Sequence, residues 1–259
     1  MFAALYGDLE LHPWRDPDSQ HDAHSLFRER SLAMGWLDDR AASGGSETSL
    51  ARAPGLWALN DAGWEDPLGH TDSGLVSWFQ VEASAAADDR ALPVWPFLRC
   101  AGDVMSRVGT LRLTALQVLV PAQGVDPTRR PAYARVPSIA TARWFAEPDS
   151  ASSCAVQVDI YGGRATELGS IATAFGEVLT QLDQAVLKVQ AIDAVGEHYA
   201  PRAAVHDSAW NGPPTSGVRL RGTAVEWSID VAGWLTEIAT DCMSQVGVQS
   251  PLLVTLARA

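Results

Sequence analysis

The side chains that could do chemistry are concentrated in two short polar segments of the chain. The first holds the densest set of possible metal ligands, which are His12, Asp16, Asp18, His21, Asp22 and His24. Imidazole and carboxylate together suit zinc or another divalent ion. The same residue types also form polar loops that lead into a helix capped by an aspartate such as Asp22. We favour the loop and predict no metal and no cofactor, with His12, His21 and His24 as the candidate ligands of the alternative.

The second polar segment surrounds His206. This histidine is followed directly by Asp207 and Ser208, which are the residue types of a nucleophilic triad. Triad members are brought together by the fold, so their adjacency in sequence is no evidence for a triad. The sequence also lacks a Gly-x-Ser-x-Gly motif and both glycine-rich phosphate-binding motifs. We therefore assign no catalytic residue from a motif.

Ten tryptophans are a large number for a chain of 259 residues. Four of them lie in predicted loops or at the edges of predicted elements, where large amphipathic rings often anchor a partner. Two aspartates lie nearby in a predicted insertion at one end of a sheet. The residues of the predicted partner-binding surface are Trp64, Trp95, Trp144, Trp210, Asp88 and Asp89.

The elements that must position these residues are suggested by an internal similarity between residues 75–122 and 224–259. The matched pairs are Val76 with Val225, Trp78 with Trp227, Met105 with Met243, and Gly109 with Gly247. In both stretches an apolar strand pattern is followed by a helical spacing and then by a second apolar run. We predict that a strand, helix, strand unit is used twice and that Trp78 and Trp227 occupy equivalent positions.

The remaining apolar patterns complete the same order of elements in each half. The predicted strands are 2–11, 55–59, 75–81, 111–120, 154–161, 186–192, 218–229 and 252–256, and the clearest predicted helices are 94–108, 166–182 and 232–246. Two successive strand, helix, strand units form a ferredoxin-like (βαββαβ) domain, with an antiparallel sheet and helices on one face. We predict an α+β protein of two tandem ferredoxin-like domains related by internal duplication. The predicted division is a first domain at 1–122, a connector containing Pro and Arg at 123–153, and a second domain at 154–259.

Composition restricts the class of partner. The net charge is −12, from 31 acidic and 19 basic residues, and such a surface repels the phosphates of nucleic acid and favours a basic partner. No apolar run approaches the roughly 20 residues that span a bilayer, so we expect no membrane insertion. Cys100, Cys154 and Cys242 are far apart and form no C-x-x-C pair, which is typical of a cytoplasmic protein.

Two functions fit these observations. The first is a non-catalytic acidic binding protein that captures a protein partner, as immunity proteins and secretion chaperones do. The second is a cofactor-independent enzyme or small-molecule binder with a pocket between the sheet face and the helices. The residues of that predicted pocket are Trp78, Trp227, Tyr161, Asp159 and His206, with Asp159 or His206 as the proton-handling group. We favour the binding protein.

Overall fold

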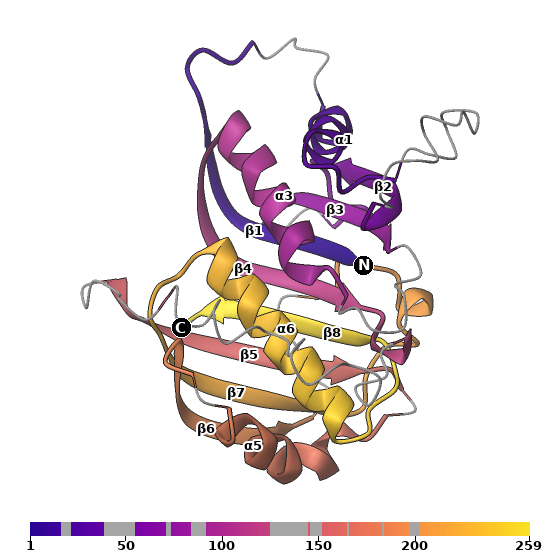
Figure 1. Cartoon of the computed structure of the whole chain (residues 1–259), viewed down its shortest axis with the longest axis vertical. Coiled ribbons are helices and arrows are strands. Elements are labelled where there is room, and N and C mark those ends of the chain that lie inside the picture. Colours follow the sequence, from indigo (N-terminus) through magenta and orange to yellow (C-terminus); the bar gives the residue numbers. More distant parts are fainter. Residues whose placement is uncertain are drawn as a thin grey trace.

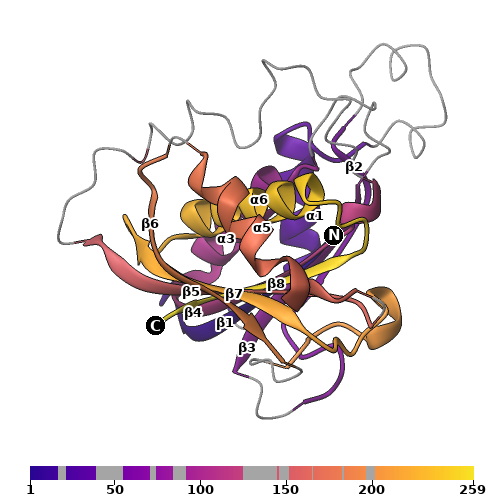
Figure 2. The ribbon, with the colours of Figure 1, turned by 90° about the horizontal axis from the view of Figure 1, so that it is seen from below.

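The computed structural model describes residues 1–16, 22–38, 55–70, 74–83, 92–124, 145, 152–164, 166–182, 184–196 and 202–259. These residues form an α+β structure, which confirms the predicted class. One antiparallel sheet has helices α1, α3, α5 and α6 on one of its faces (Figure 1, Figure 2). The first-half elements are β1 (Phe2–Leu11), α1 (Ala23–Ala33), β2 (Trp57–Gly63), β3 (Leu75–Ala83), α3 (Val94–Val108) and β4 (Gly109–Val120). Those of the second half are β5 (Cys154–Gly162), α5 (Ala172–Thr180), β6 (Leu187–Val195), β7 (Gly217–Ala224), α6 (Ile229–Gln245) and β8 (Leu252–Arg258).

The two halves share one sheet, which corrects the prediction of separate sheets. The strand order is β2-β3-β1-β4-β8-β5-β7-β6, and β4 pairs with β8 from Ala115↔Ala257 to Val120↔Leu252. The last six residues of β4 and the first five of β8 are all buried. Strands with so much apolar surface would be exposed edges in separate sheets, and pairing them with each other removes both edges. Within each half the four strands follow the same spatial order.

The expected equivalence of Trp78 and Trp227 is wrong. Trp78 lies within β3, whereas β7 ends at Ala224 and leaves Trp227 in the linker before α6. The strand ends early because Ser228 begins the helix, accepting a hydrogen bond from the Val231 N–H as an N-cap.

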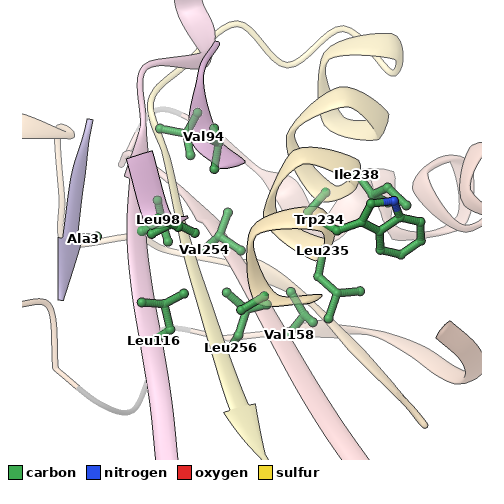
Figure 3. Packing of buried hydrophobic residues seen from close by; sticks show 14 of the residues in the cluster. Ala3, Val94, Leu98, Leu116, Val158, Trp234, Leu235, Ile238, Val254 and Leu256 are labelled. Carbon is green, nitrogen blue, oxygen red and sulfur yellow. The ribbon is translucent and has the colours of Figure 1, made fainter. Parts of the chain in front are cut away.

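The core between the sheet and the helices is filled by large apolar side chains. Figure 3 shows core side chains that project from three strands, β4, β5 and β8, toward α3 and α6. The labelled residues are Leu116, Val158, Val254 and Leu256 of the strands, Leu98 of α3, and Trp234, Leu235 and Ile238 of α6. All of these side chains are buried. The middle of this layer therefore holds core rather than the pocket that the second hypothesis requires.

The opposite face of the sheet is partly covered by the connection between β6 and β7. Ala203, Ala204 and Trp210 from this connection pack against a second buried cluster that includes Tyr6 and Tyr161. Polar contacts hold the cover in place, since the Ala204 N–H donates to the Gln117 side-chain oxygen at 3.0 Å. This face is consequently less open than a bare four-stranded sheet would be.

Of the described helices, α1 and α6 begin at a side-chain cap, whereas α3 and α5 do not. Asp22 accepts a hydrogen bond from the Ser25 N–H at the start of α1, as its position in the sequence predicted. The longest described helix is α6, with 17 residues. Among the residues that the structure describes, no helix has the length and apolarity needed to cross a membrane.

Candidate functional site

The predicted partner-binding residues do not form one exposed surface in the part of the chain that is described. Trp144, Asp88 and Asp89 lie outside the described residues. Trp210 is fully buried, so it offers no surface to a partner, because the cover on the sheet packs around it. Trp64 and Trp95 are half-buried and lie in separate places, one after β2 beneath the Arg15 guanidinium and the other in the first turn of α3.

The five residues of the predicted pocket are divided between the two faces of the sheet. Trp78 and Tyr161 both pack in the cluster on the face away from the helices, whereas Trp227 packs against the helix-side core. Asp159 is 2% exposed and accepts two hydrogen bonds from Arg219. The ring of His206 is exposed and bonds with Ser208 of the same turn. These side chains therefore do not converge on one cavity.

The candidate metal ligands are also separated. His24 lies beside Met1, at the start of β1, and His12 follows the end of that strand. Ten strand residues span roughly 30 Å, far more than a shared metal allows. His21 lies outside the described residues, within which no group of three or more His, Cys, Asp or Glu side chains could hold a metal.

A groove that the sequence did not predict opens where β4 continues beyond its pairing with β8. It has a volume of about 550 Å³ and is bounded by the last turns of α3, the start of β4, the linker before α6, and the end of β8. A smaller hollow of about 250 Å³ adjoins it and shares Gly102, Ser106, Ser228 and Ile229 with it. The two hollows form one continuous depression between α3 and α6.

Local sequence explains why the groove is present at this end. β4 has 12 residues and β8 has seven, so β8 pairs with the second half of β4 alone. Gly102 brings α3 close to the start of α6, since a Cβ atom there would lie 2.9 Å from the Ile229 Cδ1 atom. The Trp227 indole closes one side by donating a hydrogen bond to the Leu113 carbonyl at 2.8 Å.

The groove is cationic in a chain of net charge −12. The described residues that line the larger hollow include Arg112, Arg258 and His12, and they include no carboxylate. Neither arginine makes an ion pair or hydrogen bond with a described residue, even though Asp8 lies opposite Arg112 on β1. Two guanidinium groups that line one concave surface without a hydrogen-bonded carboxylate among the described residues are suited to holding an anion.

The charges of the adjoining hollow are satisfied internally. Arg99 contacts Asp230 at 2.7 Å and Asp103 at 3.4 Å, and Asp103 also accepts two hydrogen bonds from Arg30. These carboxylates are therefore engaged by their own arginines. They leave Arg112 and Arg258 as the groups of the groove that are available to a ligand.

A larger and more open hollow of about 820 Å³ lies at the other end of β1. Its lining includes the carboxylates Asp61 and Glu82, and burial lowers the pKa of the Met1 amino group beside them to about 6, so the hollow offers no arginine or lysine among its described lining residues. The groove of about 550 Å³ is the better candidate because its described lining holds two arginines and no carboxylate, and neither arginine forms an ion pair with a described residue.

Sequence reasoning missed both groove arginines. Arg258 follows the apolar run 252–256, and Arg112 stands alone within an apolar strand pattern. The one available signal was that a charge interrupts the apolar run 111–120, and this signal does not indicate a partner. Comparisons with protein-family models, curated proteins and solved structures find no match to the chain. A functional assignment therefore depends on the chemistry of the groove.

Proposed function

We propose that the protein is a non-catalytic binding protein that captures a protein partner, an acidic group of which docks in the groove that Arg112 and Arg258 line. The observation that supports this proposal is a pair of guanidinium groups that form no ion pair or hydrogen bond with a described residue, beside a groove whose described lining has no carboxylate. Guanidinium groups stay protonated at any working pH and present fixed donors, so they bind and orient an anion rather than transfer a proton. Each charge-assisted hydrogen bond formed there would contribute about 1.5–3 kcal/mol.

The charge of the rest of the molecule suggests what kind of protein this partner is. A net charge of −12 attracts a basic protein at long range and speeds the encounter. At short range, the arginines of the groove favour an acidic group instead. We therefore propose a partner that is basic overall and presents an acidic segment to the groove.

The second candidate is an acidic small molecule bound at the same place. The volume of about 550 Å³ favours it, because small-molecule sites in proteins commonly measure about 300–1,000 Å³. This candidate keeps the predicted location of a pocket between sheet and helices. Of the five predicted pocket residues, however, only Trp227 lines this groove.

We also propose that the two halves are ferredoxin-like units that arose by duplication. Their identical strand order supports this origin. The similarity at Met105 and Met243 supports it as well, because both side chains are buried near the ends of α3 and α6.

The proposed function is tested by affinity purification from the native host with wild-type and charge-reversed protein. The R112E/R258E variant should recover about tenfold less of any stoichiometric partner, which corresponds to about 1.4 kcal/mol. The matched control is R28E/R164E, which reverses two exposed arginines away from the groove. Recovery of the partner by R112E/R258E at the control level would refute the groove assignment. Wild-type protein that carries no partner but binds a small carboxylic acid would favour the second candidate.

A further inference from the structure

We infer that Trp14 and Leu11 form an apolar anchor for the protein partner, and that they receive an apolar side chain of the partner that lies next to an acidic residue. This inference rests on the proposed function and adds a second contact surface at one end of the groove. It follows from the exposure of the two side chains, the contacts that hold the indole, and the charge beside it.

Trp14 and Leu11 are the two most exposed large apolar side chains among the residues that the structure describes. They are 63% and 53% exposed, whereas the next two, Met34 and Leu68, are 40% and 38% exposed. Both lie at the end of β1, three positions apart in the chain. Neighbouring exposed apolar side chains of this size are typical of a site that a partner covers, and tryptophan is enriched among the residues that dominate binding energy.

The Trp14 indole is held in place although it is exposed. The His12 ring stacks on it, with the two ring centroids 5.0 Å apart and the planes at 17°, and the Arg107 guanidinium lies 5.5 Å from the indole centroid. His12 is itself fixed, because its Nε2–H donates to the Ser106 carbonyl at 3.0 Å and its backbone N–H donates to the Val108 carbonyl at 3.1 Å. A side chain that is ordered before binding loses little conformational entropy when a partner covers it.

The charge in contact with the indole is positive. Arg107 lies in the last turn of α3, and it forms no ion pair or hydrogen bond with another residue in the described part of the chain. Its guanidinium therefore keeps its N–H donors available beside the apolar surface. A carboxylate is the group that these donors bind best, and this is why we place an acidic residue next to the apolar side chain of the partner.

His12 joins this surface to the groove. Its ring lines the groove and also stacks on Trp14. One partner can therefore place an acidic group in the groove and an apolar side chain on the indole. Trp14 is the most exposed of the described tryptophans, although position in a predicted loop or at an element edge favours Trp64, Trp95 and Trp210 over it.

The probe for this inference is the peptide acetyl-Ala-Glu-Leu-Glu-Ala-amide, titrated into the full chain labelled with ¹⁵N. The NMR signal of the Trp14 indole N–H, identified by its absence in W14F, should shift as the peptide binds. L11A and R107Q should each bind the peptide about fivefold more weakly than the wild type. M34A, which shortens an exposed apolar side chain elsewhere, is the matched control and should bind it as the wild type does. The analogue acetyl-Ala-Lys-Leu-Lys-Ala-amide should leave the Trp14 signal in place.

Three results would overturn the inference. They are an unchanged Trp14 signal at about 1 mM glutamate peptide, equal shifts with the glutamate and lysine peptides, and a signal that moves with protein concentration alone, which would identify a second copy of this chain as the occupant. Recovery of the partner from the native host separates the inference from the proposed function. If R112E/R258E loses the partner and W14A keeps it, the groove assignment stands and the anchor is refuted. If W14A loses the partner and R112E/R258E keeps it, the anchor stands and the groove assignment is refuted.

Discussion

Substitution of Arg219 should lower the stability of the protein more than substitution of most other partly exposed residues, because it would leave the buried Asp159 carboxylate without its partner charge. Asp159 lies in the centre of β5 with 2% of its side chain exposed. The Arg219 guanidinium donates to its two oxygens at 2.7 and 2.9 Å, and Gln157 donates to one of them at 3.0 Å. Arg219→Met removes two of these three hydrogen bonds and the compensating charge.

The expected loss of stability follows from the unequal exposure of the two partners. Removing one member of a buried ion pair costs about 3–5 kcal/mol, which is a large part of the 5–15 kcal/mol that typically stabilises a domain. Asp159→Asn should cost less, about 1–2 kcal/mol, because Arg219 is 30% exposed and can be hydrated. In the double variant D159N/R219M no buried charge is left, so at least half of the loss caused by R219M should be recovered.

The chain supplies a matched control for this experiment. Arg221 lies two residues after Arg219 on β7 and forms a 2.7 Å ion pair with Asp193 of β6, but these two side chains are 53% and 48% exposed. Arg221→Met should therefore cost no more than about 1 kcal/mol. Urea unfolding followed by tryptophan fluorescence measures all four variants. If R219M proves as mild as R221M, or if D159N does not rescue it, the buried pair is not the structural element that we describe.

Two further predictions concern groups whose pKa values depend on the fold. Burial raises the pKa of the Cys100 thiol to about 11 and that of Cys242 to about 12, so thiolate is scarce at neutral pH and both should resist iodoacetamide until urea is added; peptide mapping by mass spectrometry checks this, and rapid native alkylation would contradict it. The hydrogen bond from the Ser25 N–H lowers the pKa of the Asp22 carboxyl below its ordinary 3.8. Its contribution to stability is therefore complete above 3.8 and is lost as the pH falls through the lowered value. Asp22→Ala should cost about 1 kcal/mol at neutral pH and less in strong acid, as urea unfolding of both proteins would show; a deficit that does not change with pH would exclude the charged cap.

The charge of the groove lining differs in sign from the net charge of the molecule. The chain as a whole carries an acidic excess of 12 charges, yet the described lining of the groove contains no carboxylate. A uniformly acidic surface would be explained by solubility alone. A groove lined by two arginines and no described carboxylate is instead expected of a surface that binds an acidic group, and this is why the proposal centres on Arg112 and Arg258.

The sequence alone predicted the elements that depend on local patterns. The buried apolar spacing of α3 agrees with the helix predicted over 94–108, because it depends on neighbours three and four residues apart. The Asp22 cap was predictable for the same reason, since its acceptor and donor lie three residues apart. The order of the elements follows from these patterns, and so does the α+β class.

Only the tertiary structure decided which elements meet. An apolar edge strand needs a partner, but its own residue pattern does not show which strand that partner is. The pairing of β4 with β8 could therefore not be predicted from the local pattern. That pairing joins the two halves and, because β8 is shorter than β4, creates the groove that Arg112 and Arg258 both line. The burial of Trp210 could likewise not be predicted, since the local sequence does not show whether a tryptophan in a loop faces water or packs on a sheet. Period and capping are properties of a few adjacent residues, whereas a site assembled from distant strands exists only after the chain has folded.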